Sequence, residues 1–193
     1  MGEPGTAVPE SGQRINPSPV KDGTGSRAKL QTMPRVLIVA YGNPIRSDDG
    51  VAWHAADQLQ HKFAGSKIAA EVEILRCHQL APELAEAVSH SDVVIFLDAA
   101  SANAGGQPGE LRCEEILLPA GKTSFSHHLS PNAVLALSHQ LYSSSPRAYA
   151  LTLTGECFDH GESLSPAVEA ALPEWIARTE ALVRQLLSSE RQV

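Results

Sequence analysis

Residues 35–59, RVLIVAYGNPIRSDDGVAWHAADQL, decide the fold. The stretch opens with a β-branched apolar run, Val36 to Val39, without the polar alternation of a half-exposed strand. Such a run is typical of a strand that is covered on both faces of a parallel sheet. A Gly-Asn-Pro turn at residues 42–44 ends this strand. A helix is expected over about residues 49–63, because four apolar residues recur on one of its faces: Val51, Ala55, Leu59 and Phe63.

Two adjacent carboxylates, Asp48 and Asp49, stand between this strand and this helix. Ser47 is expected to be the N-cap, which leaves both carboxylates in the first turn, where the helix dipole stabilises negative charge by about 0.3–1 kcal/mol each. Capping is therefore one interpretation of the pair. The other is a ligand site, because open α/β sheets bind ligands at the carboxyl ends of their strands.

From Arg35 onward the pattern alternates between strands and helices. Four further strands are expected: over about residues 71–76, in the apolar run DVVIFLD that ends at Asp98, over about 110–117 and over about 148–154. Three further helices are expected over about residues 80–89, 130–142 and 165–187. This order predicts an α/β fold. We expect a three-layer α/β/α architecture with a mostly parallel central sheet covered by helices on both faces.

The first 33 residues differ in composition from the rest of the chain. Residues 1–33 are rich in Pro, Gly and Ser and have almost no large apolar side chains, so burial cannot compensate for the entropy of ordering them. We expect a disordered N-terminal extension there. Residues 34–193 have the length of a single domain.

Charge and hydropathy exclude several classes of protein. The 193-residue chain has a formal net charge of −7, and no expected helix carries a row of Lys and Arg, so nucleic acid is not an expected partner. No apolar stretch approaches the roughly 20 residues of a membrane span, and the N-terminus lacks the apolar core of a signal peptide. We therefore expect a cytoplasmic protein without a membrane partner. Its cysteines fit neither a disulfide framework nor a paired-cysteine zinc site.

Three places carry residues suited to chemistry: the pair Asp48 and Asp49, Asp98, and the pair His127 and His128 in the loop SFSHHLSP. Because the carboxyl ends of parallel strands meet at one edge, the carboxylates of the first two places are candidates for a single crevice. Two carboxylates and an imidazole suit a divalent transition metal. The alternative is a solvated histidine pair in a loop, with Asp98 capping the turn that follows it.

Four motifs, taken together, resemble the hydrogenase maturation proteases: GNPIRSDDGVA at 42–52, FLDAA at 96–100, HHLSP at 127–131 and GESLSPAVEAAL at 161–172. Members of that family remove a C-terminal extension from the large subunit of a [NiFe]-hydrogenase after nickel has been inserted. The resemblance implies a sheet with helices on both faces and a metal bound in a cleft by Asp49, Asp98 and His127. It also implies that the metal is nickel supplied by the immature large subunit, the expected partner.

The segment after the second expected strand departs from the pattern of many family members. It reads Cys77-His78-Gln79-Leu80, where many relatives have a Gly-Gly-Thr-like segment, and CHQLAPELA resembles the branch serving bidirectional, NAD-linked hydrogenases. We take His78, Gln79 and His128 as candidate substrate-binding residues, Gln79 because its amide both donates and accepts hydrogen bonds. The alternative for His78 is a polar residue satisfied by a loop carbonyl.

The chain lacks a self-sufficient hydrolytic motif. It has no HExxH helix and no Gly-x-Ser-x-Gly elbow, so peptide hydrolysis would need a metal to polarise the carbonyl or activate water. We therefore expect a metal-dependent endopeptidase of the aspartic or nickel-dependent type. The sequence does not assign the group that activates water. One alternative is a non-hydrolytic, nickel-sensing assembly factor. Another is a phosphorylase-like or nucleotide-binding protein, disfavoured because the turn at 42–44 has one glycine and a proline without an N–H.

Overall fold

The computed structural model describes residues 1–2, 35–102, 105–117 and 129–189. The chain divides into residues 1–31 and residues 32–193, and every described helix and strand belongs to the second unit. The prediction of disorder over residues 1–33 falls almost wholly outside the described residues.

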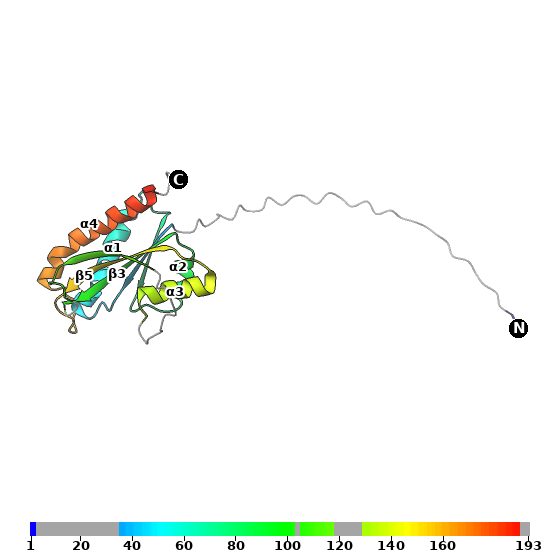
Figure 1. The fold of residues 1–193 in the computed structure, drawn as a ribbon, viewed down its shortest axis with the longest axis horizontal. Helices are drawn as coiled ribbons and strands as arrows, with labels where there is room; N and C mark the ends of the chain where they lie inside the picture. Colours follow the sequence, from blue (N-terminus) through cyan, green and yellow to red (C-terminus); the bar gives the residue numbers. More distant parts are fainter. Residues whose placement is uncertain (3–34, 103–104, 118–128, 190–193) are drawn as a thin grey trace. The chain divides into compact units, whose positions relative to one another are not determined.

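A five-stranded sheet forms the centre of this unit (Figure 1). Its strands lie in the order β2-β1-β3-β5-β4 and comprise β1 (Val36–Tyr41), β2 (Val72–Cys77), β3 (Val93–Ser101), β4 (Leu111–Ile116) and β5 (Arg147–Gly155). All pairings are parallel except that of the edge strand β4 with β5. The prediction of a mostly parallel sheet is confirmed.

Helices cover both faces of the sheet, as the sequence predicts. The helices are α1 (Val51–Phe63), α2 (Leu84–Ser89), α3 (Pro131–Tyr142) and α4 (Pro166–Ser189), and a 3-10 turn, η1 (Ser47–Gly50), precedes α1. One hydrophobic cluster joins α1 and α4 to one face, and a second joins α2 and α3 to the other (Figure 1). No described helix combines the length and apolar character needed to cross a membrane.

The apolar run of β1 owes its continuity to these two layers. Val36, Ile38 and Ala40 belong to the cluster with α1 and α4, whereas Leu37 and Val39 belong to the cluster with α2 and α3. All five are at most 1% exposed. Because successive side chains point to opposite faces of a strand, two covered faces require apolar residues at every position.

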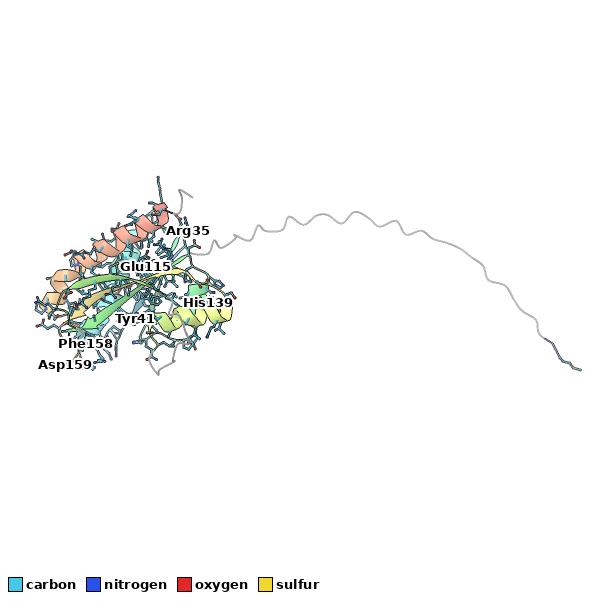
Figure 2. The ribbon with its side chains drawn as sticks, viewed as in Figure 1. Arg35, Tyr41, Glu115, His139, Phe158 and Asp159 are labelled. Atoms are coloured by element: carbon cyan, nitrogen blue, oxygen red, sulfur yellow. The ribbon has the colours of Figure 1, made fainter. Side chains whose placement is uncertain are left out.

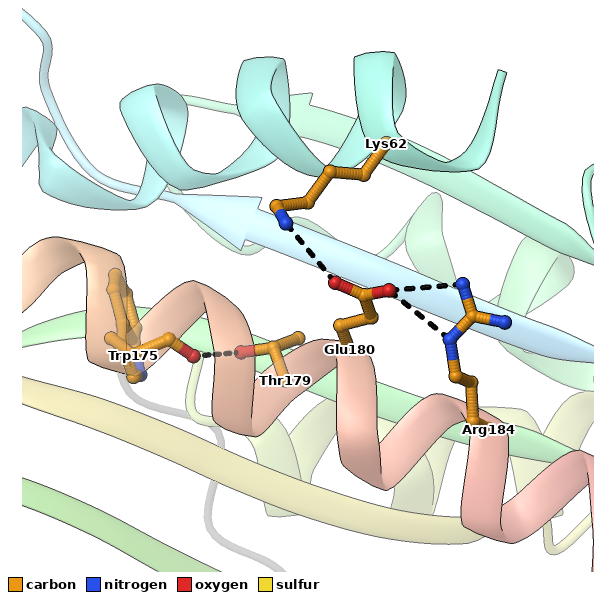
Figure 3. Close-up of polar contacts among 5 residues, drawn as sticks. All are labelled: Lys62, Trp175, Thr179, Glu180 and Arg184. Atoms are coloured by element: carbon orange, nitrogen blue, oxygen red, sulfur yellow. Dashed lines mark hydrogen bonds and ion pairs between the residues drawn. The ribbon is translucent and has the colours of Figure 1, made fainter. Parts of the chain in front are cut away.

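Polar contacts reinforce the packing of α1 against α4 (Figure 3). The carboxylate of Glu180 accepts from Lys62 of α1 at 3.3 Å and from Arg184, one turn further along α4, at 2.9 Å. The Thr179 hydroxyl, which is fully buried, donates to the carbonyl of Trp175 at 2.9 Å. The Lys62–Glu180 ion pair joins α4 to α1, whereas the other two contacts lie within α4.

Two local predictions are wrong. Ser47 is not an N-cap: its φ is 47°, and its hydroxyl donates to the carbonyl oxygen of Asp159 at 3.2 Å, while α1 begins after Gly50 without a side-chain cap. Asp98 does not end its strand either. β3 runs on to Ser101 because β5 pairs with it residue by residue as far as Gly155.

Candidate active site

A pocket of about 170 Å³ lies where the carboxyl ends of β1 and β2 meet β3. Its described lining is Tyr41, Gly42, Asp49, His78, Gln79, Leu80, Asp98 and Leu129. Figure 2 labels Arg35, which precedes β1, and Tyr41, the last residue of β1; the pocket lies at the Tyr41 end of this strand. The pocket brings together four of the residues singled out from the sequence: Asp49, Asp98, His78 and Gln79. His127 and His128 lie outside the described residues.

Asp49 reaches the pocket because η1 packs tightly against the end of β1. Its Oδ2 accepts a hydrogen bond from the backbone N–H of Asn43 at 3.1 Å. Gly42 has a φ of 135°, and a Cβ at this position would lie 2.1 Å from the carbonyl oxygen of Asp49. Glycine is therefore required at position 42 for both its backbone conformation and the close approach of Asp49.

Asp48, the neighbouring carboxylate, is fully buried and is not part of the described lining of this pocket. Its Oδ2 accepts from the backbone N–H groups of Glu156 and Cys157 and from the Ser165 hydroxyl, at 2.8–2.9 Å, and its Oδ1 accepts from the backbone N–H of Ser165 at 2.7 Å. Burial opposes ionisation, but these donors outweigh it and lower the pKa of Asp48. The capping interpretation is wrong for Asp48, which instead holds the loop between β5 and α4.

Further contacts join the same two segments. The guanidinium of Arg46 donates to the carbonyl of Phe158 at 3.1 Å, the backbone N–H of Ser47 donates to the carbonyl of Gly161 at 2.7 Å, and the N–H of Gly161 donates back to the carbonyl of Ile45 at 3.0 Å. We call residues 45–48 and 156–165 together the Asp48 latch. The latch fixes η1, and Asp49 with it, to the end of β5.

Asp98 stands inside β3, half-buried beside Tyr41. Burial and the negative charge of Asp49 raise the pKa of Asp98 to about 6, although hydrogen bonds from the Tyr41 hydroxyl and the Ala99 backbone act in the opposite direction. Burial and the neighbouring carboxylate also raise the pKa of the Tyr41 phenol. Tyr41 was not singled out from the sequence, because its partner stands on another strand.

His78 follows β2 directly and packs against Trp53 of α1. The two ring centroids are 5.3 Å apart, with an interplanar angle of 51°. The indole N–H of Trp53 donates to the carbonyl of Gly42 at 3.0 Å, which anchors this aromatic side chain to the turn after β1. Among the described residues, no loop carbonyl accepts a hydrogen bond from His78, so the structure does not support that alternative.

The two carboxylates of the pocket suit a divalent cation whose remaining ligands come from the molecule that carries it. Asp49 and Asp98 contribute two carboxylates, which are common ligands of divalent metals. Within the described parts of the chain, no three His, Cys, Asp or Glu side chains are placed to hold one ion. His78 therefore lines the pocket without joining the two carboxylates in a three-ligand group.

The turn at 42–44 is not built as a phosphate cradle. The backbone N–H of Gly42 donates to the carbonyl of Cys77 at 3.2 Å, and that of Asn43 donates to Asp49. Both donors are thus engaged, and a carboxylate occupies the place that a bound phosphate would need. The geometry gives no support to the nucleotide-binding alternative.

Comparison with known proteins identifies the fold. No protein-family model matches the chain, and no curated protein sequence does. Among solved structures, the chain is similar to the hydrogenase maturating endopeptidase HybD from Escherichia coli, with 20% identity, a TM-score of 0.62, and coverage of 78% of this chain and 93% of that one. It is also similar to two [NiFe] hydrogenase maturation proteases from Thermococcus kodakarensis. These are HybD (24% identity, TM-score 0.60, 77% and 98% coverage) and HycI (22%, 0.58, 80% and 92%). The protein therefore has the α/β fold of the hydrogenase maturation proteases.

Proposed function

We propose that the protein is a cytoplasmic endopeptidase that removes the C-terminal extension of a [NiFe]-hydrogenase large-subunit precursor after nickel insertion. One observation carries the proposal. Two carboxylates from different elements, Asp49 of η1 and Asp98 of β3, line one pocket in a chain whose structural neighbours are hydrogenase maturation endopeptidases.

Asp49, Asp98 and His127 would contact the nickel that the substrate carries. Leu129, two residues after His127, lines the same pocket as the two carboxylates. Each carboxylate accepts hydrogen bonds from the protein, yet a carboxylate has about four lone-pair sites, so both keep capacity for a metal. Imidazole and carboxylate are ligands that nickel accepts.

The pocket favours a nickel-loaded substrate over an empty one for an electrostatic reason. Burial and the charge of Asp49 disfavour the ionised form of Asp98 and raise its pKa to about 6. A divalent cation entering with the substrate offsets both effects, whereas a nickel-free precursor leaves them in place. Discrimination then comes from a contact that exists in only one state of the substrate.

Gln79 and His128 would hold the peptide next to this centre. Gln79 is exposed on the pocket wall, where its amide can pair with both an N–H and a carbonyl of an extended substrate chain. The nickel, when bound, supplies a positive charge that polarises the substrate near the scissile bond. The Asp48 latch would hold Asp49 in its position in the pocket beside Asp98 while the peptide binds.

Purified protein mixed with nickel-loaded precursor, and separately with nickel-free precursor, tests the proposal. Intact-mass measurement should show loss of the C-terminal extension only in the nickel-loaded sample. Binding of the nickel-loaded precursor without cleavage would instead identify a nickel-sensing assembly factor. Equal cleavage of both precursors would contradict nickel recognition.

A further inference from the structure

Four titratable side chains line the pocket within the described residues, and they differ in what they already bind. Tyr41 donates a hydrogen bond to Asp98, and Asp49 accepts one from the backbone of Asn43. The fourth, His78, forms no hydrogen bond or ion pair with any described residue. His78 is thus the pocket imidazole whose ring nitrogens stay available to a substrate.

The position of the His78 ring is nonetheless restrained. The carbonyl of Cys77, the preceding residue, accepts from the N–H of Gly42, and the Trp53 indole that packs on His78 donates to the carbonyl of the same glycine. The two rings are tilted by 51° with their centroids 5.3 Å apart, and His78 itself is exposed. The contact with Trp53 therefore restrains the imidazole at the pocket wall while His78 stays accessible.

His78 shares the pocket with the two carboxylates that we propose as metal contacts, without being grouped with them as a ligand. It lines the pocket with Asp49 and Asp98, yet these three do not form a group placed to share one ion. An imidazole beside a polarised peptide, but not a ligand of its metal, is suited to proton transfer. Imidazole is also the side chain most often used for that task near neutral pH.

We propose that His78 is a catalytic residue that carries the proton during peptide cleavage, an inference that rests on the proposed endopeptidase function. Neutral His78 takes a proton from a water molecule as the water oxygen bonds to the scissile carbonyl carbon. The imidazolium then gives that proton to the amide nitrogen as the C–N bond breaks, and the electron pair of this bond leaves with the nitrogen. One water is consumed, the products are a carboxylic acid and an amine, and His78 returns to its neutral form.

Single-turnover cleavage of nickel-loaded large-subunit precursor tests this role with His78→Asn and His78→Ala. The cleavage step should slow by about 100-fold or more, since a positioned acid–base group contributes about 10²–10⁴-fold. Binding of the precursor should change little. The solvent deuterium isotope effect on the cleavage step should differ between His78→Ala and the wild type, because the group that transfers the proton has been removed; a purely structural role would leave that isotope effect unchanged.

Two further variants serve as controls. His54→Asn makes the same chemical change on the exposed face of α1 without touching the pocket lining, and it should cleave at the wild-type rate. Gln79→Ala removes a proposed peptide contact from the adjacent position, so it should raise KM more than it lowers kcat. Thermal midpoints should match that of the wild type for the exposed positions His54 and His78.

The outcomes separate the two proposals. Wild-type protein that leaves the nickel-loaded precursor intact would refute the proposed function and the His78 role with it. If wild-type protein cleaves the precursor and His78→Asn cleaves equally fast, only the His78 role is wrong. Slower cleavage explained wholly by weaker binding, or a solvent isotope effect that is the same in His78→Ala and wild type, would also overturn proton transfer by His78.

Discussion

Asp98 is the residue whose surroundings most change its chemistry. With a pKa raised to about 6, by burial first and the Asp49 charge second, this carboxylate binds a proton more tightly in the folded protein than in the unfolded chain. Its contribution to stability is therefore full below the unfolded pKa near 4 and is lost as the pH rises through about 6. At neutral pH the ionised Asp98 carboxylate lowers the stability of the folded protein, and a bound cation would offset this effect.

Asp98→Asn should therefore separate stability from activity. The amide keeps an oxygen that can accept the Tyr41 hydroxyl but has no charge, so at pH 7.5 the free energy of unfolding should rise, by at most about 3 kcal/mol. Cleavage of nickel-loaded precursor should collapse because the charge that a divalent ion needs is gone. Urea unfolding at pH 7.5 and below pH 4 checks the first point, since the gain should disappear in acid. A variant that is less stable at pH 7.5, or that cleaves normally, would contradict this account.

The two adjacent histidines should differ in the same assay. His127→Ala should abolish cleavage, because the family resemblance assigns the metal contact to His127. His128→Ala should have a milder effect, mainly on precursor binding. The two cleavage rates, measured at saturating precursor, show which histidine contacts the metal. A larger loss in His128→Ala would assign the metal contact to His128 instead of His127.

Among the elements, the Asp48 latch connects the helix side of the pocket to the end of β5. Asp48 is fully buried and accepts four hydrogen bonds, and their donors lower its pKa in the folded state. A lowered carboxylate pKa contributes stability that is present above the unfolded pKa near 4 and is lost as the pH falls through the folded value. The latch is therefore expected to weaken in acid.

Asp48→Asn should destabilise the protein by about 2–4 kcal/mol, because the amide NH₂ would face N–H donors and leave them without an acceptor. Asp159→Asn makes the same change at an exposed position of the same loop and should leave the unfolding free energy within about 0.5 kcal/mol of wild type. Urea unfolding at pH 7 compares the two. Equal effects from both variants would show that the latch does not depend on the buried charge.

At the scale of the whole molecule, the N-terminal segment raises a separate question. Its composition predicts no packed structure, and segments without packed contacts add little to stability. A protein that starts at Met33 should therefore keep its thermal midpoint and its cleavage rate. A drop of several degrees in the midpoint, measured by differential scanning calorimetry against the full chain, would show that the extension packs on the domain.

Patterns that repeat along the chain were enough to predict the fold. The apolar run of β1, the helical periodicity from Val51 to Phe63 and the alternation of strands with helices each reflect a local rule, so they predict the layers without knowledge of distant contacts. The same reasoning places Asp49 and Asp98 at one edge, because parallel strands end on the same side. Both carboxylates do line one pocket.

Only the tertiary structure decided what each polar side chain binds. The donors to Asp48 lie more than a hundred residues away, and most are backbone N–H groups, which every residue but proline carries and which leave no mark in a sequence. The Tyr41–Asp98 hydrogen bond and the Trp53–His78 packing likewise join different elements. Sequence periodicity reports which face of an element is buried, whereas the partner of a buried carboxylate depends on how separate elements come together in space.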